Sequence, residues 1–181
     1  MALANKSTKR TKLLEDIIEV MKNHEIFSDN VKRKDDEVTI QKALFLRLEK
    51  GKLLSNILLE NNITTSKEKA DEIALKNFSY EQDINTTVKQ FCIFGTQHRP
   101  DAVLELGDFR IAIEIKKGTN GASIRSGLGQ SLLYSHQYDF TIYFFVDTTQ
   151  GLDIKSSVQG SKEQEIVNQL WDSHNVKFVV V

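Results

Sequence analysis

Asp101, Glu114 and Lys116 are the side chains of this sequence best suited to perform chemistry at one point. They combine hard oxygen ligands, which Mg²⁺ and Mn²⁺ prefer, with an amine that can contact a phosphate or a water molecule. Two carboxylates that lie side by side repel each other, so a shifted pKa, a nearby cation or a metal has to offset the repulsion. We therefore predict that the three side chains converge around a divalent metal ion.

A predicted β-hairpin would bring these residues together. Two apolar-rich runs, 101–106 and 109–116, flank Gly107-Asp108, which favours a two-residue type II′ turn because glycine takes a positive φ at little cost. Counting outward from this turn places the two acids opposite each other, with the lysine two residues farther along the same face. The pairs on the other face are all apolar, so we expect that face to lie on the core.

Composition sets the broad class of the chain. The 181 residues include 27% charged and 40% hydrophobic side chains, as is usual for one globular domain with a sizeable core. A net charge of −1 excludes a uniformly basic nucleic-acid coat but permits a local basic patch. The single cysteine, Cys92, excludes an internal disulfide. No long apolar run or signal-peptide pattern is present, so we expect a soluble, cytoplasmic protein without membrane attachment.

The first part of the chain has the period of helices. Residues 12–80 are predicted to form a helical N-terminal part after a flexible tail at 1–8, because their apolar residues recur at spacings of three and four. The expected helices cover 12–27, a second stretch from 36 or 37 to 59 with an interruption at Gly51, and 66–78 after a capping-box pattern.

From residue 84 to residue 181 the pattern indicates a core that contains a sheet. The expected strands are 86–94, the two hairpin strands, 140–146 and 176–181, and the expected helices are 123–137 and 162–171. The run 140–146 is almost continuously apolar, which is typical of a strand buried on both faces. A meander followed by helical crossovers predicts one α/β domain over 1–181, with a mixed central sheet flanked by helices.

The hairpin and its surroundings resemble the PD-(D/E)xK nuclease superfamily. Pro100-Asp101 is similar to the first half-motif and Glu114-Ile115-Lys116 to the second. Gln130-Ser131-Leu132-Leu133-Tyr134 resembles the Gln-x-x-x-Tyr motif of the exonuclease-like branch. The resemblance covers roughly residues 37–146 in order, and it implies the restriction-endonuclease-like αβββαβ core with extra N-terminal helices.

The resemblance also implies roles for individual residues. Asp101, Glu114 and the backbone carbonyl of Ile115 would bind the metal, and Glu37 would be an additional acidic ligand. Two neighbouring aspartates compete with Glu37 for that role, and the helix dipole favours an acid there in any case. Lys116 would orient or deprotonate the attacking water, or stabilise the developing charge.

The helix after the hairpin supplies the remaining candidates. Gln130 and Tyr134 lie four residues apart and share a helix face, so Gln130 would complete the catalytic group and Tyr134 would brace the site or the DNA. Ser123 and Arg125 lie near the helix N-terminus, where a DNA phosphate can bind. The alternative is an ordinary helix whose tyrosine packs on the sheet.

Two other groups of charged residues are not expected to belong to the site. Glu105 lies about 13 Å along the strand from Asp101 and is expected to pair with Arg110 across the hairpin. A second acid-x-Lys triplet, Asp153-Ile154-Lys155, has no Pro-Asp partner on a neighbouring strand and is interpreted as chance.

The sequence therefore predicts a Mg²⁺- or Mn²⁺-dependent deoxyribonuclease that acts as an endonuclease, with a homodimer as a further possibility. The alternative is a non-catalytic DNA-binding or assembly subunit that retains the nuclease fold. RNA cleavage is a third interpretation, for which the sequence gives no positive sign. The presence of all three central residues favours the enzyme.

Overall fold

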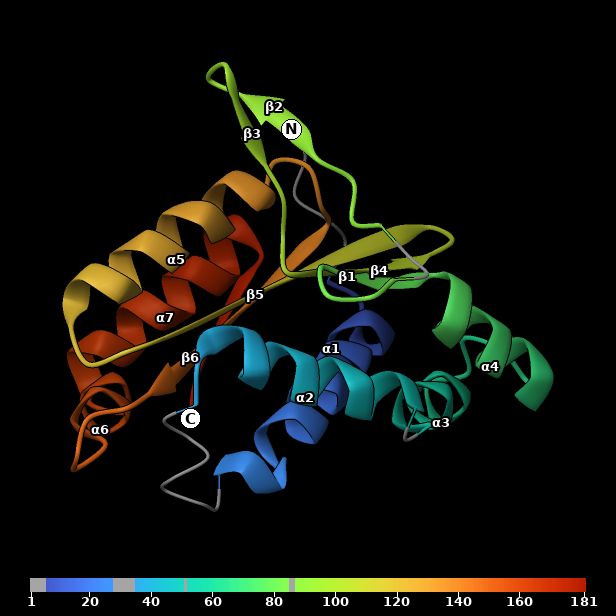
Figure 1. The fold of residues 1–181 in the computed structure, drawn as a ribbon, viewed down its shortest axis with the longest axis horizontal. Helices are drawn as coiled ribbons and strands as arrows, with labels where there is room; N and C mark the ends of the chain where they lie inside the picture. Colours follow the sequence, from blue (N-terminus) through green and yellow to red (C-terminus); the bar gives the residue numbers. More distant parts are fainter. Residues whose placement is uncertain (1–5, 28–34, 51, 85–86) are drawn as a thin grey trace.

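The structure is a computed structural model that describes residues 6–27, 35–50, 52–84 and 87–181 (Figure 1). The helices are α1 (Thr8–Lys22), the short 3-10 helix η1 (Glu25–Phe27), α2 (Glu37–Lys50), α3 (Leu53–Glu60), α4 (Lys67–Lys76), α5 (Gly121–Tyr134), α6 (Asp153–Val158) and α7 (Ser161–His174). The strands are β1 (Phe78–Tyr80), β2 (Phe91–Ile93), β3 (Thr96–His98), β4 (Ala102–Leu106), β5 (Phe109–Gly118), β6 (Phe140–Asp147) and β7 (Val176–Val180).

Within these residues, five strands form a mixed sheet in the order β1-β4-β5-β6-β7. Strands β1, β4 and β5 are antiparallel neighbours, whereas β5, β6 and β7 run parallel. Strands β2 and β3 pair only with each other and form a ribbon that projects from the body of the molecule (Figure 1). The predicted α/β architecture with a mixed central sheet is confirmed.

Helices cover both faces of this sheet. Figure 1 shows α5 and α7 on one side of the sheet and α1, α2 and α3 on the other. The larger apolar cluster joins α1, α2, α3 and α4 to one face of the hairpin. That face includes Leu104, Ile111, Ile113 and Ile115. The N-terminal helices and the sheet therefore share one core, and the expected apolar face of the hairpin does lie on it.

The hairpin has the register that its turn predicts. Leu106 pairs with Phe109 and the ladder continues to Ala102 opposite Ile113. Gly107 has a φ of +58°, and no positive φ occurs at the next residue, as a type II′ turn requires. The following position in this register would place Asp101 opposite Glu114, just beyond the last ladder pair.

Helix α5 lies unusually close to strand β6. A Cβ atom at Gly127 would lie 2.5 Å from a ring carbon of Tyr143, so only glycine permits this approach. The Tyr143 hydroxyl donates a hydrogen bond to the backbone oxygen of Ile124 at 3.1 Å. This contact ties the first turns of α5 to the sheet and so positions the later turns.

The prediction of the first strand of the core was wrong. The edge of the sheet is β1, which pairs with β4, and not a strand over 86–94. Phe94 and Gly95 both have positive φ, so the chain reverses there and β2 pairs with β3 instead of joining the sheet. Strand β1 has only three residues, too few for a period to be recognised.

Several predicted boundaries also shift. The helix predicted over 66–78 ends at Lys76, because the next residues enter β1, so the helical part ends before residue 80. The helix predicted over 12–27 begins at Thr8, capped by Ser7, and ends at Lys22. A short helix, α6, lies between β6 and α7, where no helix was predicted.

Part of the predicted flexible tail at 1–8 lies within the described residues. Lys6 donates a hydrogen bond to the backbone oxygen of Trp171, and its amine lies 4.4 Å from the centre of the indole ring. Residues 1–5 and Gly51, where a helix break was predicted, lie outside the described residues.

Candidate active site

The structure brings Asp101, Glu114 and Lys116 together at the open end of the hairpin. Asp101 retains 6% of its accessible surface and Glu114 retains 1%. Oδ2 of Asp101 accepts a hydrogen bond from the backbone N–H of Ile115 at 2.6 Å, which joins the two strands beyond their ladder. Oε1 of Glu114 lies 2.9 Å from Nζ of Lys116. Two carboxyl groups and an amine thus share a largely buried position.

Glu37, at the start of α2, completes the cluster. Its Oε1 lies 3.1 Å from Nζ of Lys116, and its Oε2 accepts a hydrogen bond from the backbone N–H of Lys117 at 3.1 Å. Asp36 instead caps α2, with its Oδ1 2.8 Å from the backbone N–H of Thr39. Of the competing acids, Glu37 is therefore the one that contacts the lysine of the site.

The amine of Lys116 lies between two carboxylates, those of Glu114 and Glu37. Burial alone would lower the pKa of Lys116, but the charges of Glu114 and Asp101 outweigh burial, and the net pKa is raised. Lys116 therefore stays protonated throughout the physiological range of pH.

Burial raises the pKa of both acids, whereas an exposed salt bridge lowers the pKa of a carboxyl group. Loss of hydration, followed by the charge of Glu114, raises the pKa of Asp101 to about 8. Loss of hydration also raises the pKa of Glu114, although the charge of Lys116 opposes this shift. Because ionised forms are disfavoured here, the pair would gain from a further cation.

Tyr134 and Gln130 lie beside the acids on the last turns of α5. Tyr134 is fully buried, and its hydroxyl donates a hydrogen bond to the backbone oxygen of Arg99 at 2.9 Å. Burial, and then the nearby charge of Glu114, raise the pKa of Tyr134. The hydroxyl therefore fixes the segment that leads into Asp101, as well as lying against the site.

Two oxygen atoms in this cluster have neither a hydrogen-bond partner nor an ion pair among the described residues. Oε1 of Gln130 is buried and accepts no hydrogen bond from the described residues, and neither does Oε2 of Glu114. The hydroxyl of Tyr134 donates to the backbone oxygen of Arg99. Buried oxygens without donors carry free lone pairs, which a cation or a bound water can satisfy.

The donor chemistry of the cluster fits a hard divalent cation. Asp101, Glu114 and Glu37 supply carboxylate oxygens, and Ile115 supplies a backbone carbonyl, all ligand types that Mg²⁺ and Mn²⁺ prefer. Among the described residues, no three acid, histidine or cysteine side chains are grouped as closely as the ligands of a bound metal. Instead, the ammonium group of Lys116 supplies the positive charge between two of the acids.

Ser123 and Arg125 occupy a different place from the predicted cluster. Both lie in the first turns of α5, where Oδ1 of Asn120 already accepts hydrogen bonds from the backbone N–H groups of Ala122 and Ser123 at 3.0 and 3.3 Å. Arg125 is exposed. No hydrogen bond or ion pair between described residues joins either side chain to the acids, so their predicted contact with DNA stays a prediction.

The pair predicted between Glu105 and Arg110 is contradicted. They are register partners, yet they form no ion pair in the described part of the chain. Arg110 donates instead to the backbone oxygen of Gln137, and its guanidinium lies 5.4 Å from the centre of the Tyr138 ring. A carbonyl acceptor and an aromatic face compete successfully with an exposed carboxylate, whose attraction water weakens.

Tyr143 belongs to the surroundings of the site and was missed. It is the register partner of Glu114 on β6, and its pKa is raised by burial and then by the charge of Glu114. A tyrosine in a largely apolar buried strand was the available signal, because its hydroxyl requires a partner.

Comparisons with protein-family models, with curated proteins and with solved structures found no match. In the stretches that the structure describes, no helix is both long enough and apolar enough to cross a bilayer.

Proposed function

We propose that this protein is a metal-dependent nuclease that hydrolyses DNA phosphodiester bonds. The observation that carries the proposal is the amine of Lys116 held 2.9 Å from a buried Glu114 carboxylate and 3.1 Å from Glu37, beside a buried Asp101. The arrangement fits the resemblance to the PD-(D/E)xK nucleases and the restriction-endonuclease-like fold. The observed order of three antiparallel strands, a helix and a parallel strand supports the same proposal.

The charge balance of the cluster favours a divalent cation. Three carboxyl groups, from Asp101, Glu114 and Glu37, lie around one amine, which leaves a charge of −2 when all of them are ionised. Burying unpaired charge costs several kcal/mol, on the order of 3–5 kcal/mol when a partner is missing. A fold that served only structure would gain by replacing these acids with apolar residues of similar size.

Each residue of the cluster has a role in this proposal. Asp101, Glu114 and the carbonyl of Ile115 would hold Mg²⁺ or Mn²⁺, with Glu37 as a further acidic ligand. A bound divalent ion would stabilise charge on the phosphate oxygens and make a water molecule more acidic. The remaining steps fall to side chains of the protein itself.

Lys116 would stabilise charge. Without metal, the neighbouring carboxylates raise the pKa of Lys116, so the amine holds its proton and can donate hydrogen bonds to a phosphate oxygen or to the attacking water. Oε1 of Gln130 can accept a hydrogen bond from that water and so orient it, because this atom has no other partner among the described residues. Tyr134 holds the segment before Asp101 in place.

Plasmid cleavage in the presence of Mg²⁺ or Mn²⁺ tests this proposal. Asp101→Asn and Lys116→Ala should each lower the rate by about 100-fold or more, because the first weakens the proposed metal site and the second removes a positive charge that would stabilise the reacting phosphate. The chain supplies a matched control in its second acid-x-Lys triplet. Asp153→Asn and Lys155→Ala should retain the rate of the wild type.

One set of results would contradict the nuclease proposal. If purified protein cuts no form of DNA with either metal, and the Asp101 and Lys116 variants behave as the wild type does, the nuclease proposal fails. A non-catalytic DNA-binding subunit would then be the better account. Supercoiled plasmid has no ends, so its cleavage also tests the proposed endonuclease mode, and light scattering would test the proposed homodimer.

A further inference from the structure

A groove lies beside the candidate active site, on the same face of the sheet. Its cavity volume is about 490 Å³. Val103 and Glu105 of β4 line it, and alternate residues of a strand share a face, so these side chains continue the row that starts at Asp101. Val103 lies only two residues from Asp101, about 7 Å along the strand. A strand of nucleic acid held at the acids could therefore extend into the groove.

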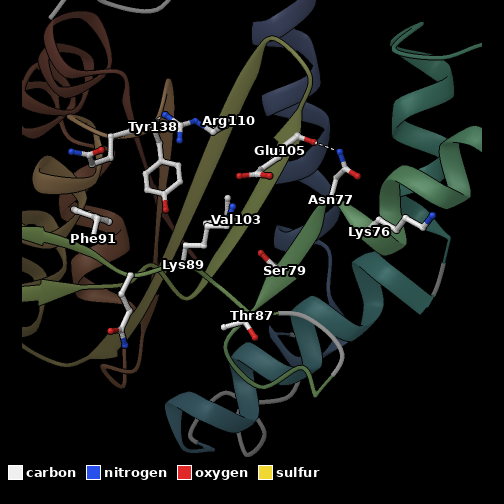
Figure 2. A pocket seen from close by; sticks show the side chains of 12 residues that line it. Lys76, Asn77, Ser79, Thr87, Lys89, Phe91, Val103, Glu105, Arg110 and Tyr138 are labelled. Carbon is white, nitrogen blue, oxygen red and sulfur yellow. Dashed lines mark hydrogen bonds between the residues drawn. The ribbon is translucent and has the colours of Figure 1, made fainter.

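Aromatic rings connect the groove to the site. Phe91 packs edge-on against Tyr134 of the site at a centroid distance of 5.8 Å, and against Tyr138 of the groove at 6.1 Å. Figure 2 shows Tyr138 and Phe91 on one side of the groove, with Asn77 and Ser79 on the other. One wall is thus aromatic and the opposite wall is polar.

The lining of the groove is positively charged. It includes Lys76, Lys89 and Arg110 against a single acid, Glu105, which gives three positive charges minus one, or +2. The whole chain, by contrast, carries a net charge of −1. Lys89 is exposed and forms no ion pair with any described residue, so its charge is available to a ligand.

We propose that this groove binds an unpaired nucleotide of a DNA strand, with its base against Tyr138 and Phe91 and its phosphates near Lys89 and Arg110. The proposal rests on the proposed nuclease function, which it deepens by naming the form of the substrate. It makes single-stranded DNA, or DNA with an opened segment, the preferred ligand.

The physical reason for an unpaired nucleotide lies in the shape and chemistry of the walls. An aromatic side chain can stack only on a base whose face is free, and bases in a duplex already stack on their neighbours. Asn77, Ser79 and Glu105 offer donors and acceptors to the edge of such a base, an edge that pairing would otherwise occupy. Cations beside aromatic rings are the combination that single-strand binding uses, because the cations contact the phosphates.

Fluorescence anisotropy with a labelled single-stranded DNA 12-mer tests the inference without requiring cleavage. The same oligonucleotide as a duplex, and an RNA of the same sequence, are the comparison ligands, and EDTA prevents hydrolysis. Tyr138→Ala and Lys89→Ala should each weaken binding of the single strand by roughly fivefold or more. Tyr138→Phe, which keeps the ring, and Lys67→Ala, an exposed lysine at the other end of α4, should bind as the wild type does.

Either proposal can fail without the other. The groove inference is overturned if Tyr138→Ala and Lys89→Ala bind the single strand as tightly as wild type, if Tyr138→Phe loses as much as Tyr138→Ala, or if duplex or RNA binds more tightly. Exposed Lys89 keeps the test valid should the Tyr138→Ala protein fold poorly. If binding depends on the groove but no DNA is cut with Mg²⁺ or Mn²⁺, the nuclease proposal falls and the groove inference stands.

Discussion

Burial and the neighbouring Glu114 raise the pKa of Asp101 to about 8, far above the value of an aspartic acid in an unfolded chain. The folded protein therefore binds this proton more tightly than the unfolded chain does. The resulting stabilisation is complete below the unfolded pKa, near pH 4, and is lost as the pH rises through 8. Without metal, the protein should thus become less stable between pH 5 and pH 8.5.

Urea unfolding in EDTA at these two pH values measures the effect. The wild type should lose about 1–3 kcal/mol of unfolding free energy over this range, and Asp101→Asn should lose clearly less because its amide does not ionise. The raised pKa of Lys116 does not contribute, since the lysine stays charged throughout the range. An unchanged pH dependence in the Asp101→Asn protein would contradict the assignment.

The sequence predicted some residues of the site better than others. The position of Asp101 opposite Glu114 could be predicted by counting residues outward from Gly107. A two-residue turn sets the register of the two strands that it joins. The choice of Glu37 over Asp36 came from the resemblance and could not be derived from the spacing of the residues. Both lie at the start of one helix, and only the docking of α2 against the end of β5 decides which acid reaches Lys116.

Helix α5 carries Gln130 and Tyr134 to the site, and Gly127 sets its distance from the sheet. Gly127→Ala would place a Cβ atom 2.5 Å from the Tyr143 ring, so the helix or the ring has to move. We expect a loss of about 1–3 kcal/mol in unfolding free energy. Gly129 is the matched control, because a Cβ atom there meets nothing within 4 Å.

Gly129→Ala should stabilise the protein by about 0.5–1 kcal/mol, since alanine in a helix loses less entropy on folding than glycine. Chemical denaturation of the two variants beside the wild type measures both effects. If the two substitutions changed stability equally and in the same direction, the close packing of α5 on Tyr143 would not control its position.

Elements differ in how far the sequence could predict them. Strand β6 was recognisable from its length and continuous apolar character, and all eight of its residues are buried. Strand β1 was not, because three residues show no period and its place is set by pairing with β4. The run 86–94 has the composition of a strand, but the turn at Phe94-Gly95 commits its last part to a local ribbon.

For the whole molecule, the net charge of −1 hides two regions of opposite sign on one face of the sheet. The acids around Lys116 would attract a divalent cation, and the groove lined by Lys89 and Arg110 would attract phosphates. The groove could not be predicted from the sequence, because its walls come from the end of α4, from β1, β2, β4 and β5, and from the segments before β2 and after α5. Only the folded sheet places them side by side.

The central claim is that Asp101 and Glu114 form a divalent metal site, and a titration with Mn²⁺ followed by electron paramagnetic resonance tests it most directly. Free Mn²⁺ loses its signal on binding, so the method reports binding without any need for cleavage. We predict saturable binding by the wild type that tightens as the pH rises towards 8, because the metal competes with the proton on Asp101. Binding should be lost in Asp101→Asn and Glu114→Gln and retained in Asp153→Asn. Equal binding by all four proteins, or no saturable binding by the wild type, would contradict it.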